Sequence, residues 1–206
     1  ISVVPDYLEK AYLASSGTEV TEMALKLIRL SSRIHKRKGY IICFSGAYHG
    51  RTLGAQQLTG NINAKEWIKS KDPEILHIDF PYPWISGVEE SDFFDKQMQL
   101  LCAKYNILPE KDIAGFFIET FQGWGGIFYP ENYMNSLSAY SQKYNIITCF
   151  DEMQAGFGRT GKLFGFQHYN IRPQLVCLGK GASSGFPLSI VLGTKDLLDL
   201  PEVGSM

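Results

Sequence analysis

Short runs of apolar residues recur along this chain and predict the strands of a buried sheet. The strongest runs cover residues 40–44, 113–121, 146–150 and 175–178, and the segments 75–80 and 189–193 have the same character. Apolar runs that end at turn signals suit strands covered on both faces, as strands are in a parallel sheet. The pattern therefore predicts a mostly parallel central sheet.

Apolar residues at helical spacing predict helices between these strands. The first helix follows Ser16, which is expected to form a capping box with Glu19, and Gly39 is expected to end it. Two further amphipathic segments cover residues 91–106 and 131–145. Strands that alternate with helices in this way indicate an α/β fold in which helices cover the sheet.

Two of the predicted strands lead directly into charged residues. The run 146–150 leads into Asp151, and the run 175–178 leads through Gly179 into Lys180. In open α/β sheets, ligands bind outside the carboxyl ends of the strands, so both side chains are expected at one edge. A simple ion pair would explain them. So would a pyridoxal phosphate site, which needs a lysine for the aldehyde and an acid for the pyridine nitrogen.

The composition is that of an ordinary globular domain. The 206 residues are 45% hydrophobic and 20% charged, with a net charge of -1, and a chain of this length can bury one large core. Nucleic acid and anionic membranes favour a basic surface, and this balance of charges does not provide one. The basic run Lys36–Lys38 is interpreted as the solvated end of the first helix, where cations complement the helix dipole.

The cysteines and histidines indicate neither a disulfide framework nor a metal site. Cys43, Cys149 and Cys177 lie in strand-like runs, and no two cysteines have CxxC spacing. We expect these thiols and that of Cys102 to be reduced, as in a cytoplasmic protein. The four histidines lack the spacing of metal ligands, and no apolar run is long enough to span a bilayer.

The segment around Asp151 resembles a family signature. The sequence FDEMQAGFGRTGKLFGF, followed by LGKG, is similar to the signature of class III (ornithine/4-aminobutyrate type) aminotransferases, and matching segments extend from Ala14 to Gly193. These are fold-type I pyridoxal phosphate enzymes, so the resemblance implies a three-layer α/β/α sandwich. It also implies that residues 1–206 form the large cofactor-binding domain in incomplete form, lacking an N-terminal segment and a C-terminal domain.

The resemblance implies a catalytic pair and a cofactor site. Lys180 would bind the aldehyde of the cofactor and shuttle a proton, and Asp151 would keep the pyridine nitrogen protonated. The segment SSGTE is similar to the family's phosphate cup, in which Gly17 and Thr18 would hold the phosphate at the start of a helix. Tyr48 would stack on one face of the ring.

Four polar residues complete the predicted cofactor site. The segment YHG at 48–50 matches the family's aromatic-His-Gly segment and adds His49, while Gln154 matches the residue that hydrogen-bonds the ring hydroxyl. Glu119 and Gln122 belong to a segment similar to the family's E-P-x-Q-G-x-G-G, and we expect them in the polar shell around the ring. Without the resemblance, the histidine would be interpreted as structural and Gln154 as a polar loop residue.

One departure from the family pattern concerns the substrate. Trp124 stands where 4-aminobutyrate and ornithine enzymes often carry a glutamate, which pairs with a C-terminal arginine and lets the site alternate between two substrates. A tryptophan cannot pair with an arginine through charge, although a cation–π contact is available to it. The departure leaves the residues for transamination in place and leaves the amino donor open.

The resemblance implies ping-pong transamination from an amino acid or an ω-amine such as 4-aminobutyrate to a 2-oxo acid. In the family the arginine that binds the substrate carboxylate would lie beyond Met206, and the site is shared across a homodimer. A racemase, an aminomutase or a decarboxylase on the same scaffold is the alternative. A binding module without catalysis is a further one, which Lys180, Asp151 and Gln154 together argue against.

The chain also contains a glycine pattern that is typical of dinucleotide-binding proteins. Residues 156–161, GFGRTG, satisfy GxGxxG, but a dinucleotide fingerprint needs a helix that opens at its glycines. Here Gly165 and several aromatic residues follow, with little helical pattern. We therefore expect no dinucleotide site in this segment. Gly179 and Lys180 also lack the upstream glycine of a P-loop, which argues against nucleotide hydrolysis.

Overall fold

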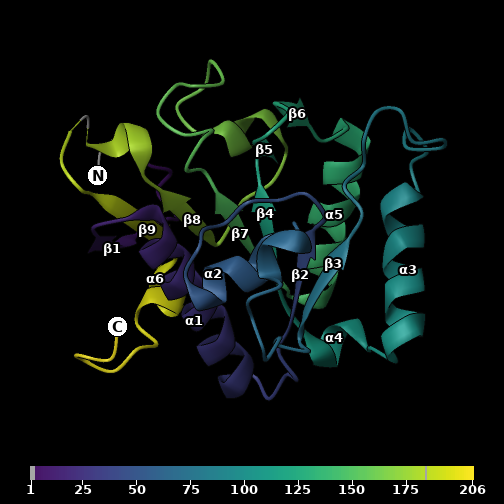
Figure 1. Ribbon diagram of the computed structural model, residues 1–206, viewed down its shortest axis with the longest axis horizontal. Helices are drawn as coiled ribbons and strands as arrows, with labels where there is room; N and C mark the ends of the chain where they lie inside the picture. Colours follow the sequence, from purple (N-terminus) through teal and green to yellow (C-terminus); the bar gives the residue numbers. More distant parts are fainter. Residues whose placement is uncertain (1–2, 184) are drawn as a thin grey trace.

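A computed structural model describes residues 3–183 and 185–206 of the chain, and they form a central sheet between two layers of helices (Figure 1). The sheet runs in the order β1 (Lys10–Ala14), β9 (Ser189–Gly193), β8 (Leu175–Leu178), β7 (Ile147–Asp151), β4 (Ile113–Glu119), β2 (Tyr40–Phe44) and β3 (Ile75–Ile78). The five strands from β8 to β3 are parallel, β9 is antiparallel to β8, and β1 is antiparallel to β9. The predicted three-layer α/β/α sandwich is confirmed.

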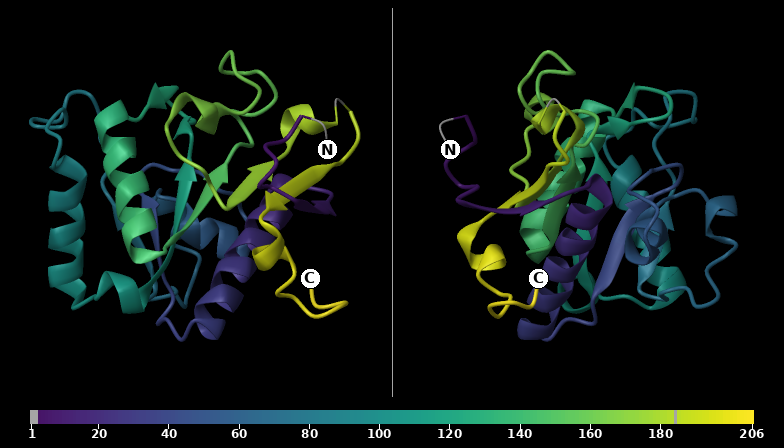
Figure 2. Two further views of the ribbon diagram at one scale, coloured as in Figure 1. Left: turned by 180° about the vertical axis from the view of Figure 1, so that it is seen from behind. Right: turned by 60° about the vertical axis from the view of Figure 1, so that its left-hand side comes forward.

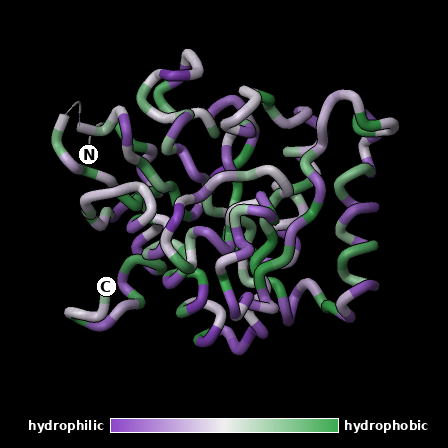
Figure 3. The backbone as a smooth tube through the Cα atoms, viewed as in Figure 1, coloured by the Kyte–Doolittle hydropathy of each residue, from purple (hydrophilic) through white to green (hydrophobic). Residues whose placement is uncertain are grey.

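Helices cover both faces of the sheet because both faces of its strands are apolar. In β2, Ile42 and Phe44 belong to one buried hydrophobic cluster, and Ile41 and Cys43 belong to the other. The first cluster is completed by α3 (Phe93–Tyr105) and α5 (Glu131–Tyr144), and the second by α1 (Gly17–Ile34), α2 (Leu53–Leu58) and α6 (Lys195–Leu198). Figure 2 shows the two helix layers from other sides, and Figure 3 shows hydrophobic stretches along the central strands.

The first helix ends earlier than its sequence predicts. Gly39 was expected to stop it, but α1 ends at Ile34, and Lys36 adopts a left-handed conformation with φ 52°. The N–H of Lys36 donates to the carbonyl of Arg33 at 3.2 Å, and the N–H of Arg37 donates to the carbonyl of Ser32 at 2.8 Å. This is a Schellman motif, in which a lysine occupies the position that usually holds glycine.

The interpretation of the basic run as a solvated helix end is wrong for its middle residue. Arg37 donates from its two terminal guanidinium nitrogens to the carbonyl of Ile113 at 2.6 Å and to that of Tyr144 at 2.7 Å. These carbonyls belong to the start of β4 and the end of α5. Arg37 therefore joins three elements at the edge of the sheet opposite the carboxyl ends of its parallel strands.

The predicted strand 113–121 is two strands. Strand β4 ends at Glu119, and after Thr120 the short strand β5 (Phe121–Gln122) pairs with β6 (Ile127–Phe128) in a separate two-stranded sheet. The predicted strand 75–80 ends at Ile78. The sequence pattern also missed β1, α2 and α4 (Pro109–Asp112), which are short. Short 3-10 helices cover Asn63–Lys65, Gly165–His168 and Lys180–Ala182.

The glycine-rich segment 156–161 forms turns, as expected, and no helix opens at it. Among residues 3–183 and 185–206, none of the helices combines the length and apolar character that a membrane crossing requires.

Candidate active site

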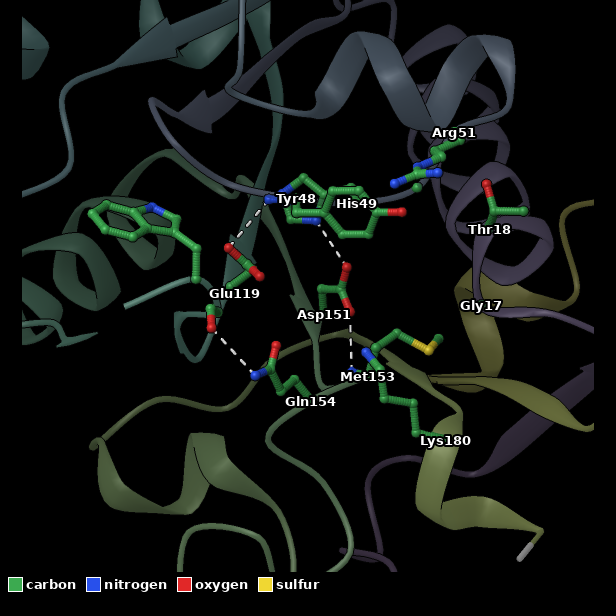
Figure 4. A pocket seen from close by; sticks show the side chains of 13 residues that line it. Gly17, Thr18, Tyr48, His49, Arg51, Glu119, Asp151, Met153, Gln154 and Lys180 are labelled. Carbon is green, nitrogen blue, oxygen red and sulfur yellow. Dashed lines mark hydrogen bonds and ion pairs between the residues drawn. The ribbon is translucent and has the colours of Figure 1, made fainter. Parts of the chain in front are cut away.

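A cavity of about 580 Å³ lies at the carboxyl ends of the parallel strands (Figure 4). Such a volume is typical of sites that enclose small molecules. Eight of the nine residues predicted for the cofactor site line it: Gly17, Thr18, Tyr48, His49, Glu119, Asp151, Gln154 and Lys180. They come from segments far apart in the sequence, and the parallel order of β2, β4, β7 and β8 brings them to one edge of the sheet.

Asp151 is the last residue of β7, and its carboxylate is held on both oxygens. The ring nitrogen Nδ1 of His49 lies 2.8 Å from Oδ2, and the backbone N–H of Met153 donates to Oδ1 at 3.0 Å. Both side chains are buried, and the His49 ring packs edge-on against Phe117 with centroids 4.7 Å apart. The carboxylate is therefore fixed in orientation before any ligand binds.

Lys180 follows β8 and lies at the same edge as Asp151. Strands β7 and β8 are parallel neighbours, with Asp151 opposite Cys177, which places Lys180 three residues beyond that pair. Figure 4 shows the lysine side chain directed into the cavity toward the aspartate. The backbone of Lys180 has φ 44°, a left-handed conformation that is uncommon outside glycine. Strain of this kind is found where a side chain must be aimed at a site.

The start of α1 forms another wall of the cavity. The carboxylate of Glu19 accepts the N–H groups of Ser15 at 2.8 Å and Ser16 at 2.7 Å, which confirms its capping interaction. The first N–H groups of a helix have no partner within the helix, so those of Gly17 and Thr18 are available to a ligand. A Cβ atom on Gly17 would lie 2.8 Å from Sδ of Met153, so the close packing here favours glycine.

Glu119 ends β4 directly opposite Asp151 in the sheet register. It is buried, and its Oε2 accepts a long hydrogen bond of 3.3 Å from the N–H of Tyr48. Burial raises the pKa of Glu119 to about 7, and the negative charge of Asp151 adds to this effect. The group can therefore gain or lose a proton near neutral pH.

Glu152, the acidic residue after Asp151, stabilises a loop. Glu152 is fully buried and accepts the N–H groups of Gly165 at 2.6 Å and Phe166 at 2.7 Å, as well as the hydroxyl of Thr120. Its burial raises its pKa. Glu152 fixes the loop beside the cavity and does not line the cavity itself.

Gln122 is the one predicted site residue that lies outside the cavity lining. Its side-chain amide donates to the carbonyl of Ser45 at 2.8 Å and so attaches the β5–β6 hairpin to the end of β2. Five further lining residues were not among the predicted site residues: Gly50, Arg51, Gly123, Trp124 and Met153. Arg51 follows the YHG segment by one residue, so its position in that loop was the available signal.

The class III aminotransferase family matches residues 1–206, and the chain belongs to this family. An alanine/serine racemase from Pyrococcus horikoshii is 32% identical, over 97% of this chain and 44% of its own length. The 4-aminobutyrate aminotransferase of Escherichia coli K12 is 35% identical, over 98% of this chain and 46% of its own. A crystal structure of an (S)-enantioselective omega-transaminase from Thermomicrobium roseum has a TM-score of 0.86 at 30% identity, covering 97% of this chain and 46% of that one. The chain thus spans just under half the length of these relatives.

Proposed function

We propose that the protein uses pyridoxal phosphate to transfer an amino group from an amino acid or an ω-amine to a 2-oxo acid. The observation that carries this proposal is the buried carboxylate of Asp151, held by His49, in one cavity with Lys180. Membership of the class III aminotransferases supports the same conclusion. We also propose that residues 1–206 are the large cofactor-binding domain in incomplete form.

The side chains and N–H groups of the cavity fit this cofactor. A buried aspartate suits a protonated ring nitrogen, and the start of α1 beside Gly17 and Thr18 suits a phosphate. The ring of Tyr48 offers a face for stacking, and the side chain of Gln154 offers a hydrogen bond to the ring hydroxyl. When bound, the cofactor would supply an aldehyde that takes the amino group and a ring that withdraws electrons.

The residues of this chain would have the following roles in the reaction. His49 orients Asp151, and the carboxylate of Asp151 holds a proton at the ring nitrogen. The Nζ atom of Lys180 takes a proton from the reacting carbon of the substrate and returns one, as a general base and then a general acid. Arg51 brings a guanidinium group to the cavity, where it suits a carboxylate or a phosphate. Glu119 accepts the N–H of Tyr48 and Gln122 donates to the carbonyl of Ser45, so both support the loop that carries Tyr48.

Substitution of the lysine tests this function. The full-length protein with pyridoxal phosphate is expected to be yellow, to lose this absorption when an amine donor is added and to regain it with a 2-oxo acid. Lys180→Ala should abolish both changes, because no other group is assigned to the aldehyde or to the proton. Lys143→Ala, on the exposed side of α5, is the matched control and should leave them unchanged. A colourless wild-type protein after incubation with the cofactor would contradict the proposal.

Racemisation of an amino acid is the second candidate function. The similarity to an alanine/serine racemase and to an isoleucine 2-epimerase from Lentilactobacillus buchneri, each 32% identical, favours it. A racemase needs no amino acceptor, because the proton returns to the same carbon. Loss of optical rotation from a single amino-acid enantiomer, without any 2-oxo acid, would therefore identify this activity.

We further propose a homodimer in a reducing, cytoplasmic compartment. The four cysteines are free, which agrees with reducing conditions. The mass of the full-length protein by light scattering tests the dimer, and the mass of a single subunit at micromolar concentration would contradict it.

A further inference from the structure

One wall of the cavity is aromatic, and the proposed reaction does not require an aromatic group there. Trp124 lines it, and 68% of this tryptophan is exposed. Transamination requires the lysine, the aspartate and the phosphate site, and none of these needs an indole. Large exposed aromatic groups that border a cavity mark a binding surface.

The backbone holds Trp124 in place at the tip of the β5–β6 hairpin. The N–H groups of Gly125 and Gly126 donate to the carbonyl of Gln122 at 3.3 and 2.9 Å, which closes the turn. The carbonyl of Gly123 accepts the amide of Gln154 at 3.2 Å, and a Cβ atom on Gly123 would lie 2.6 Å from Oε1 of Gln154. The hairpin is thus attached to the loop after β7, and its tip is fixed at the cavity.

Trp124 also belongs to a row of aromatic rings. Its ring centroid lies 6.3 Å from that of Tyr82, and Tyr82 stacks on Trp84 with centroids 4.6 Å apart and an angle of 11°. Tyr82 also packs against the buried Phe80, with centroids 4.9 Å apart. The row extends from the core of the protein to the cavity, so the indole has a rigid support.

The charged groups of the cavity come from other elements. Arg51 precedes α2, Asp151 ends β7, and Lys180 follows β8. The carboxyl group beside the hairpin is that of Glu119, which lies 2.9 Å from the place of a Cβ on Gly123. The ring of Trp124 is thus the large apolar group at this end of the cavity.

We propose that Trp124 determines substrate specificity by stacking on an aromatic or extended apolar part of the amine substrate. This inference rests on the proposed function and names its substrate class: amines or amino acids that carry an aromatic or apolar group away from the reacting nitrogen. A carboxylate on the same molecule would lie toward the guanidinium group of Arg51. An indole provides a large stacking face at little cost in conformational entropy.

Binding of two carboxylates without an amino group tests the inference separately from catalysis. Butyrate and 4-phenylbutyrate differ by one phenyl ring, and neither can undergo transamination. Calorimetry on the full-length holoenzyme is expected to give a preference for 4-phenylbutyrate that Trp124→Ala reduces about tenfold, near the upper end for an aromatic pair. Trp124→Phe should keep most of the preference. Trp67→Ala removes an indole that is 58% exposed but outside the cavity, and it should leave the preference unchanged.

Kinetics with butylamine and 4-phenylbutylamine as donors provide the second measurement. The ratio of their kcat/KM values should fall in Trp124→Ala by the same factor as the ratio of dissociation constants. The inference would be overturned if Trp124→Ala lowered the affinity or kcat/KM equally for both members of a pair, or for neither. It would also be overturned if Trp124→Ala changed the mass of the oligomer and left the ligand preference unchanged, because a second copy of the chain would then cover the indole. If no donor reacts while the binding preference still depends on Trp124, the proposed function fails and the aromatic wall stands.

Discussion

Glu119 and Asp151 lie opposite each other in neighbouring strands, yet their surroundings differ. Asp151 is held by the ring of His49 and by a backbone N–H group, whereas Glu119 accepts a long hydrogen bond of 3.3 Å from the N–H of Tyr48. A buried carboxylate with few donors is disfavoured in its charged form, so the pKa of Glu119 rises to about 7. The same residue type at the same edge can therefore provide either a fixed charge or a group that titrates.

Glu119→Gln is predicted to remove a pH dependence of stability. The pKa of Glu119 is raised above its unfolded value of 4.5 to about 7, so the folded protein binds more protons between these values. Its contribution to stability is complete below pH 4.5 and is lost as the pH rises through 7, on the order of 3 kcal/mol. The unfolding temperature of the cofactor-free variant, relative to wild type, should therefore increase between pH 5 and pH 8.

His77 makes this comparison between variant and wild type necessary. Burial lowers its pKa to about 4, so it contributes the opposite pH dependence between pH 4 and 6.5. His77 is present in both proteins, and its effect cancels in the difference between their unfolding temperatures. A difference that stays constant from pH 5 to pH 8 would show that Glu119 does not titrate in this range.

At the scale of elements, the sequence pattern located the interiors of strands and helices better than their ends. Strands β2, β8 and β9 have the predicted bounds, because their apolar runs stop where the backbone turns. Helix α1 ends early because hydrogen bonds to the carbonyls of Ser32 and Arg33 outweigh the unfavourable conformation of Lys36. Local spacing of apolar residues contains no information on that competition.

Lys36→Gly is predicted to stabilise the protein. The left-handed conformation costs free energy in residues other than glycine, so glycine removes this strain from the folded protein. Glycine also increases the entropy of the unfolded chain, which opposes part of the gain. We expect a net gain of roughly 0.5–1 kcal/mol in the free energy of unfolding, measured by urea denaturation. Asn145→Gly is the matched control, because Asn145 ends α5 in the same conformation, with φ 51°, and asparagine tolerates it well. A gain at Asn145 as large as that at Lys36 would contradict this explanation.

At the scale of the whole molecule, the apolar core and the candidate site occupy different places. The two hydrophobic clusters fill the spaces between sheet and helices, and Arg37 joins elements at one edge of the sheet. The candidate site lies at the carboxyl ends of the strands, from Gly17 to Lys180 in the sequence. Substitution of an exposed site residue such as Lys180 is therefore expected to leave the core intact.

The amino-acid sequence was sufficient for the fold class and for most of the candidate site. Apolar runs and helical spacing predicted an α/β fold with a mostly parallel sheet, and the ends of two runs placed Asp151 and Lys180 at one edge. The three-layer sandwich and the other site residues were implied by the resemblance to class III aminotransferases. These predictions depend on local properties: the period of side chains along an element and the residues at its end. Motifs that lie within a few consecutive residues are likewise visible without the structure.

Contacts between distant segments were decided by the tertiary structure. Three contacts join parts of the chain separated by many residues: the pairing of His49 with Asp151, the hydrogen bond from Gln122 to Ser45, and the aromatic row from Phe80 to Trp124. The antiparallel direction of β9 and the separate pairing of β5 with β6 are of the same kind. Burial and hydrogen bonding are properties of a place in space, and the local sequence pattern does not contain the neighbours that create that place.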